Sequence, residues 1–114
     1  MERDAELEVL LELNGDVIVF ENGMWARFVA ARVPPDHRRP HGVSYSLTLH
    51  SVEGKRIFGI DNAHPVRATR GPSGRSLQAL DHIHRGPNTR PYRFVDAGAL
   101  LRDFWRIVGE HTGE

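Results

Sequence analysis

The sequence contains no cysteine, which excludes disulfide bonds, thiolate metal ligands and a cysteine nucleophile. It also has no long hydrophobic run, and residues 1–13 alternate acidic with aliphatic side chains, unlike a signal peptide or a membrane span. A glycine-rich phosphate-binding loop of the P-loop type is missing as well, which argues against a nucleotidyl or phosphoryl transferase. From these absences we expect a cytoplasmic protein that makes no contact with a membrane.

The residues that are present are typical of a soluble globular protein of 114 residues, which we expect to form a single domain over 1–114. The formal net charge is zero, but the charges are unevenly distributed. Residues 1–16 hold six acidic side chains against Arg3 alone, whereas residues 66–93 hold six arginines against Asp81 alone. This separation suggests that one surface meets an anionic partner, either a nucleic acid or an acidic protein.

The pattern of side chains predicts an α+β fold. Strands are expected where apolar and polar residues alternate, and Asn-Gly and Glu-Gly pairs mark the turns between them. The expected strands cover 5–13, 17–21, 24–33, 43–52 and 55–61, followed by 81–85 and a short run at 92–94. We therefore predict an antiparallel sheet of about five to six strands, arranged as a meander.

One amphipathic helix is expected after the sheet. Asp96 suits its N-cap and Gly109 marks its expected end. The apolar residues that recur at helical spacing are Leu100, Leu101, Phe104, Ile107 and Val108. We expect this helix to pack on one face of the sheet, with Phe104 and Trp105 in the core. Trp25 is expected in the core or at an interface.

Residues 63–80 are rich in glycine, proline and arginine, and we predict that they form a flexible connection. Two interpretations of Arg67, Arg70 and Arg75 stay open. They either lie in a solvated loop or bind phosphates as a flexible arm.

The most informative stretch is Asp81-His82-Ile83-His84-Arg85. In a strand, side chains alternate between the two faces, so His82 and His84 share one face. Asp81 and Ile83 then share the other face. Histidine titrates near neutrality, so such a pair can act as a general acid and a general base.

Two other interpretations of the histidine pair stay open. A metal ion would need a third protein ligand, which His50, His64 or Asp61 would have to supply. In a purely structural role, one histidine lies on the surface and the other bonds Asp81 or a backbone carbonyl. Asp81 is the less favoured partner, because alternation places it on the opposite face.

Four blocks occur in a characteristic order: "GKRIFGIDN" (54–62), "DHIHR" (81–85), "PYRF" (91–94) and "LLRDFW" (100–105). Together they resemble the TumE family, small toxins of bacterial type II toxin–antitoxin operons that are usually encoded beside a helix-turn-helix antitoxin. The resemblance implies growth inhibition and an antitoxin partner. By analogy with other small toxins of such operons, it also implies cleavage of RNA. The 63–80 connection is longer than the family pattern leads us to expect.

With this resemblance, a metal-independent ribonuclease without a cofactor is the leading hypothesis. His82 and His84 are the candidate acid and base, assisted by the positive charge of Arg85 and by Asp61, which orients a histidine or simply caps a turn. The candidate RNA-binding residues are Asn62, Arg67, Arg70, Arg90, Tyr92 and Arg93. Asn62 serves a phosphate or caps its own turn, and Tyr92 stacks on a base or covers the sheet edge.

Two other functions are carried as alternatives. A non-catalytic adaptor would bind a protein or a nucleic acid through its sheet edge and its arginines. A nucleotidyl or phosphoryl transferase toxin would need a nucleotide and a divalent metal ion.

Overall fold

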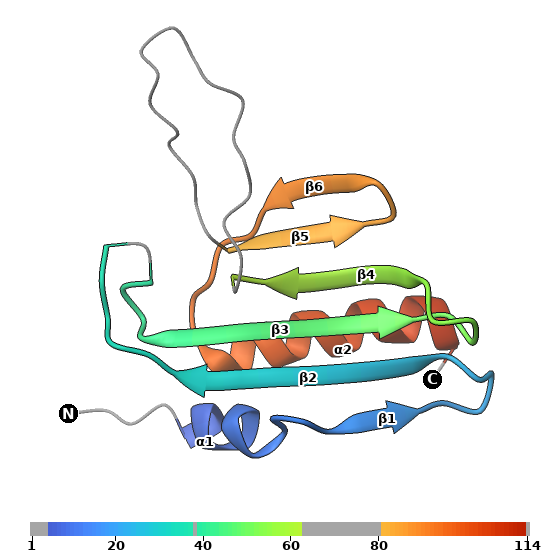
Figure 1. Ribbon diagram of the computed structural model, residues 1–114, viewed down its shortest axis with the longest axis horizontal. Helices are drawn as coiled ribbons and strands as arrows, with labels where there is room; N and C mark the ends of the chain where they lie inside the picture. The colour runs from blue at the N-terminus through green and yellow to red at the C-terminus, as the bar shows by residue number, and fades with distance from the viewer. Residues whose placement is uncertain (1–4, 38, 63–80, 114) are drawn as a thin grey trace, which may run out of the picture.

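In the computed structural model of the chain, residues 5–37, 39–62 and 81–113 are described (Figure 1). The elements in chain order are α1 (Ala5–Glu12), β1 (Val17–Val19), β2 (Trp25–Arg32), β3 (Val43–His50), β4 (Arg56–Asp61), β5 (His82–Arg85), β6 (Asn88–Pro91) and α2 (Ala97–Thr112). The flexible connection predicted over 63–80 lies outside the described residues.

The six strands form one sheet in the order β1-β2-β3-β4-β5-β6, and every neighbouring pair is antiparallel. The predicted meander and the α+β class are therefore confirmed. Short turns join β1 to β2, β3 to β4 and β5 to β6, and Gly54 and Gly86 adopt positive φ angles of 94° and 55° in the turns that follow β3 and β5.

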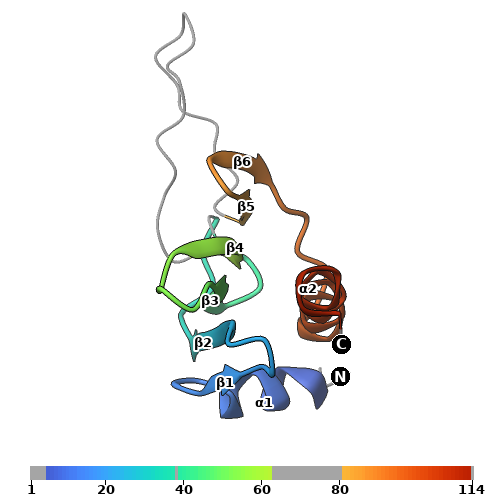
Figure 2. The ribbon, with the colours of Figure 1, turned by 90° about the vertical axis from the view of Figure 1, so that its right-hand side faces the viewer.

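The core lies between the sheet and α2, which covers one face of the sheet (Figure 2). The alternation in β3 is confirmed, because Val43, Tyr45, Leu47 and Leu49 are all buried in this core. Phe104 of α2 is fully buried as predicted, with its ring against Phe28 and Phe58. Asp96 is the N-cap of α2, and its carboxylate accepts a 2.7 Å hydrogen bond from the Ala99 N–H.

The strand predicted over 5–13 is wrong, because these residues form the helix α1. Acidic and aliphatic residues alternate there, but Leu7, Leu10 and Leu11 also follow the spacing of a helix. Leu10, which interrupts the alternation, is fully buried, whereas Val9 is half exposed. Packing of the helical face against the core therefore decides the structure of this segment.

Three further expectations need correction. Helix α2 continues through Gly109 to Thr112 and ends at Gly113, whose positive φ angle and N–H bond to the Gly109 carbonyl form the C-cap. The last strand is Asn88–Pro91 rather than 92–94, because the turn at Gly86 sends the chain straight back along β5. Trp105 is 38% exposed rather than buried in the core.

The sheet face opposite α2 is covered by no helix or strand among the described residues (Figure 2). We call this surface the open face. It carries the polar residues of β3, which are Ser44, Ser46, Thr48 and His50. The register of the sheet places Trp25 and Arg27 of β2 and Gly59 and Asp61 of β4 on this same face.

Candidate functional site

His82 and His84 share the open face, as the alternation predicts, and Asp61 joins them from the neighbouring strand. The register pairs Asp61 with His82 directly. The Nε2 atom of His82 lies 2.9 Å from Asp61 Oδ1, and the Nε2 atom of His84 lies 3.3 Å from Asp61 Oδ2. One carboxylate therefore holds both imidazoles, which pack edge to face with their centroids 4.5 Å apart.

The three residues differ in their access to solvent. Asp61 is 5% exposed and His82 is 4% exposed, whereas the side chain of His84 is 13% exposed. His82 therefore lies beneath the surface, and His84 is the imidazole that a ligand on the open face meets first.

His84 also contacts a hydroxyl group that the sequence did not single out. Thr89 of β6 lies opposite His84 in the register, and its Oγ1 is 3.0 Å from His84 Nδ1. When His84 Nε2–H donates to Asp61, its Nδ1 accepts from the Thr89 hydroxyl. The result is a chain from Thr89 through His84 to Asp61, the same order of hydroxyl, imidazole and carboxylate that activates hydroxyl groups in enzymes. The sequence pattern predicts the last strand at 92–94. A predicted strand at 88–91 would have paired Thr89 with His84.

The second nitrogen of His82, Nδ1, has no hydrogen-bond partner in the part of the chain that the structure describes. With Nε2 bonded to Asp61, Nδ1 of His82 is buried and forms no hydrogen bond with any described residue. Buried polar groups are normally satisfied, so this atom is an exception. The structural interpretation also predicted a bond to Asp81 or to a backbone carbonyl, but the partner of both histidines is Asp61.

Arg56, the first residue of β4, supplies positive charge on the same face. It is exposed and lies opposite His50 in the register. Burial lowers the pKa of His84 more than the charge of Asp61 raises it, and the charge of Arg56 lowers this pKa further. Sequence reasoning missed Arg56 because its nearness to His84 depends on the pairing of β4 with β5.

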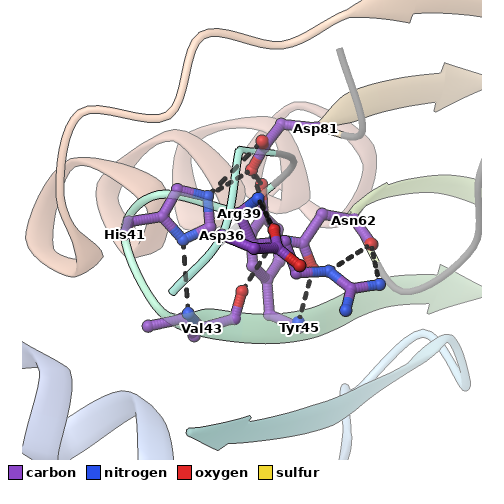
Figure 3. Close-up of polar contacts among 7 residues, drawn as sticks. All are labelled: Asp36, Arg39, His41, Val43, Tyr45, Asn62 and Asp81. Carbon is purple, nitrogen blue, oxygen red and sulfur yellow. Dashed lines mark hydrogen bonds and ion pairs between the residues drawn. The ribbon is translucent and has the colours of Figure 1, made fainter. Parts of the chain in front are cut away.

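A second polar cluster supports the site from the core side of the sheet (Figure 3). Asp81 accepts a 2.8 Å hydrogen bond from the Tyr45 hydroxyl and lies 3.2 Å from Nε2 of His41. Burial and the neighbouring Asp81 charge raise the pKa of Tyr45 far above its ordinary value, so the hydroxyl stays a donor. These contacts fix the residue immediately before His82.

Asn62 belongs to the same cluster and is fully buried. Its side-chain oxygen accepts from the Tyr45 N–H at 2.9 Å, and its amide donates to the Val43 carbonyl at 2.8 Å (Figure 3). The Arg39 guanidinium donates to the Asn62 carbonyl at 3.0 Å. The end of β4, which carries Asp61, is therefore tied to β3 by side-chain as well as backbone bonds.

Asp61, His82 and His84 also have the donor set of a metal site. One ligand atom from each residue lies within 4.8 Å of the others. Two imidazole nitrogens and one carboxylate oxygen suit Zn²⁺ or a similar transition-metal ion. Of the third ligands considered from the sequence, the structure brings Asp61 to the pair, while His50 bonds Thr48 instead. His64 lies outside the described residues.

Comparison with known proteins adds the family. The family model described as Toxin TumE matches residues 3–112, nearly the whole chain. The chain belongs to the TumE toxin family. The resemblance seen in the four sequence blocks is thereby confirmed, and the family identifies the protein as a toxin. Searches of curated proteins and of solved structures found no match. In the part of the chain that the structure describes, neither helix is long and apolar enough to cross a membrane.

The structure does not bring the predicted arginines of this TumE toxin to the histidines. Arg85 and Arg90 point to the opposite face, where they line a hollow with Ile83 and Asn88. The Arg85 guanidinium lies 3.8 Å from Glu110 of α2. Arg93 is exposed beyond β6. The roles expected for Arg67, Arg70 and Arg75 fall on residues outside those described.

Asn62 and Tyr92 of the toxin have internal partners. The Asn62 side chain bonds the β3 backbone, as described above, and offers no free group to a phosphate. Tyr92 packs against the core, and its hydroxyl donates to Asp103 of α2 at 2.6 Å. Asn62 is thus bonded to β3 rather than to its own turn, and Tyr92 is bonded to α2.

Proposed function

We propose that this TumE toxin inhibits growth as a metal-independent ribonuclease, neutralised by an antitoxin that is a helix-turn-helix protein. The observation that supports this proposal best is the hydrogen-bonded chain from Thr89 through His84 to Asp61. It lies on the open face beside the positive charge of Arg56.

The chemistry follows from this geometry. His84 takes the proton of an RNA 2′-hydroxyl group, and the 2′-oxygen attacks the neighbouring phosphorus atom. The bond from phosphorus to the 5′-oxygen breaks, and the leaving oxygen receives the proton from the imidazolium, directly or through water. The products are a 2′,3′-cyclic phosphate and a 5′-hydroxyl end.

Each neighbour of His84 has a defined part in this scheme. Asp61 fixes the tautomer and orientation of the imidazole. The RNA 2′-hydroxyl replaces the Thr89 hydroxyl as the donor to His84 Nδ1, which then accepts its proton. Arg56 stabilises the charge that develops on the phosphoryl oxygens. His82 is a positioning residue, because its bond to Asp61 Oδ1 holds the carboxylate toward His84. The antitoxin would neutralise the toxin by covering this face with acidic side chains.

The test is cleavage of a synthetic single-stranded RNA by purified toxin in EDTA, with new 5′ ends mapped in induced cells. The wild type and the His111→Ala control should cleave and arrest growth, whereas His82→Ala and His84→Ala should not. His111 is a suitable control because it is an exposed histidine of α2, which covers the opposite face of the sheet. Activity that EDTA abolishes and Zn²⁺ or Mn²⁺ restores would contradict the metal-independent mechanism. Growth arrest by all variants without new RNA 5′ ends would favour the alternative function, a non-catalytic adaptor.

A pair of arginine variants tests which sheet face is active. Arg56→Ala should lower kcat/KM by about 10- to 100-fold, since it removes one positive charge from the transition state. Arg85→Ala should change kcat/KM less than about twofold, because Arg85 lies on the other face and pairs with Glu110. Both constants are measured on the same RNA at constant ionic strength. A larger loss of kcat/KM in Arg85→Ala than in Arg56→Ala would show that the active site lies on the face covered by α2.

The pH dependence of cleavage tests the state of His84. The base must be neutral, and burial lowers the pKa of His84 below its ordinary value of about 6.5. The acid limb of the kcat/KM profile should therefore have its midpoint below that value. Arg56→Ala should move this midpoint upward, because loss of a nearby cation favours the protonated imidazole. A midpoint that does not move would show that another group controls the acid limb.

A further inference from the structure

The register of the sheet aligns four residues of the open face at one level. His84, Gly59, Thr48 and Arg27 lie opposite one another on β5, β4, β3 and β2. Neighbouring strands are about 4.8 Å apart, so His84 and Arg27 are separated by roughly 14 Å across the strands. This row runs perpendicular to the strands and begins at the candidate catalytic residue.

The middle of this row carries little side-chain bulk of its own. Gly59 has no side chain, and a Cβ atom added there would lie 3.0 Å from Thr48 Cγ2 and 3.7 Å from Arg56 Cδ. The Arg56 side chain therefore extends over Gly59, and Thr48 is only 9% exposed. A chain-like ligand that crosses the sheet between His84 and Arg27 would pass over the Arg56 side chain.

A second row lies one side-chain step further along the strands and contains Arg56, His50 and Trp25. The rings of Trp25 and His50 are stacked, with centroids 4.0 Å apart and planes 9° from parallel. His50 Nε2 is 2.8 Å from Thr48 Oγ1, and His50 Nδ1 is 3.3 Å from the Gly54 carbonyl. The imidazole is held on both sides, so it supports the indole ring as a fixed flat surface.

The charges of this face select the kind of ligand. Arg27 and Arg56 are both exposed, and neither pairs with a carboxylate among the described residues. The acid that the strands place on this face is Asp61, which is buried and bonded to the two histidines. A face with free arginines, a flat aromatic ring and no exposed strand carboxylate is complementary to a single-stranded nucleic acid.

We infer that the RNA substrate crosses the open face perpendicular to the strands, from His84 over Gly59 and Thr48 to Trp25. Its phosphates contact Arg56 and Arg27, and one base stacks on the indole ring of Trp25. This inference rests on the proposed function, but it places the phosphate-binding arginines, Arg27 and Arg56, outside the arginine-rich segment 66–93. It also gives Trp25 a role other than core packing.

The two tryptophans provide a direct test, because they lie on different parts of the molecule. Trp25 is on the open face, whereas Trp105 is on α2 and packs against Phe20 and Phe28. A Trp105→Phe/His84→Ala variant retains only Trp25 and leaves the RNA intact. Titration with a short single-stranded RNA should change its fluorescence in a saturable, salt-sensitive way. The matched Trp25→Phe/His84→Ala variant, which retains only Trp105, should show no change at the same RNA concentrations.

Affinity measured by fluorescence anisotropy of labelled RNA completes the test. In the His84→Ala background, Trp25→Ala should weaken binding about tenfold, since a stacked base contributes on the order of 1–3 kcal/mol. Arg27→Ala should weaken it severalfold at low salt, and the exposed Arg102→Ala on α2 should not. Circular dichroism establishes that each variant is folded.

The outcomes separate this inference from the proposed function. RNA binding and wild-type cleavage without any response of Trp25 would overturn the path and leave the ribonuclease intact. Binding at Trp25 without cleavage by the wild type would overturn the ribonuclease and keep the surface. The open face also carries three exposed valines, Val17, Val19 and Val29, which would suit a protein partner. A change in Trp25 fluorescence with the antitoxin but not with RNA would therefore make this face a protein interface and refute the inference.

Discussion

Cleavage of RNA is expected to fall by about 100- to 10,000-fold when His84 is replaced by alanine, the usual loss for a general base. Asp61→Asn should cause a loss of similar size. An asparagine side chain keeps the shape of Asp61, but it cannot accept from both imidazoles, so His84 loses its fixed tautomer and its compensating charge. The measurement is kcat/KM on a synthetic RNA at a temperature at which every variant is fully folded.

The double variant gives this prediction its sharpest form. If His84 and Asp61 act as one unit, His84→Ala/Asp61→Asn should be about as inactive as His84→Ala alone. Losses that multiply would indicate two independent roles. Thermal unfolding of each variant is the control, since Asp61 is buried and its replacement can also weaken the fold. An Asp61→Asn toxin with wild-type activity would remove Asp61 from the mechanism.

A second large effect is expected on stability rather than on activity. Asn62→Ala removes the side-chain hydrogen bonds to β3 and to Asp81, and it leaves the Tyr45 N–H and the Val43 carbonyl buried without their Asn62 partners. Each unsatisfied group costs about 1–3 kcal/mol, so the free energy of unfolding should fall by about 2–5 kcal/mol. In a domain of this size, such a loss lowers the Tm by roughly 10 °C or more.

Asn88→Ala is the matched control for this prediction, because Asn88 is an exposed residue of β6. Its replacement should change the free energy of unfolding by less than about 0.5 kcal/mol. Urea unfolding followed by circular dichroism gives both values. A stable Asn62→Ala protein with weakened RNA binding would restore the phosphate-binding role that the sequence allowed for Asn62.

The parts of the fold that depend on local patterns were predictable. The alternation in β3 identified its buried face, and the acidic residue at 96 identified the start of α2. The same rule correctly placed His82 and His84 on one face. Residues 5–13 were ambiguous because their leucines satisfy a strand and a helix at once, and only contact with the core distinguishes the two.

The candidate site was only half predictable, because it is assembled across strands. Asp61 meets His82, and Thr89 meets His84, through the registers of β4 with β5 and of β5 with β6. No local pattern fixes the register of β4 with β5 across the 63–80 segment, and Thr89 was missed because the tight turn between Arg85 and Asn88 was not predicted. The expectation for Arg85 failed for a different reason. Alternation along β5 already assigns Arg85 to the face of Ile83, away from both histidines.

The order of the strands along the chain also determines when the residues of the proposed active site are synthesised. The residues of the proposed centre come from β4 to β6, and α2, which covers one face of the sheet, comes last. On the proposed mechanism, a nascent chain that ends before β5 lacks both histidines, and one that ends before α2 lacks the six core residues of that helix. We therefore expect cleavage activity to arise only when translation is nearly finished.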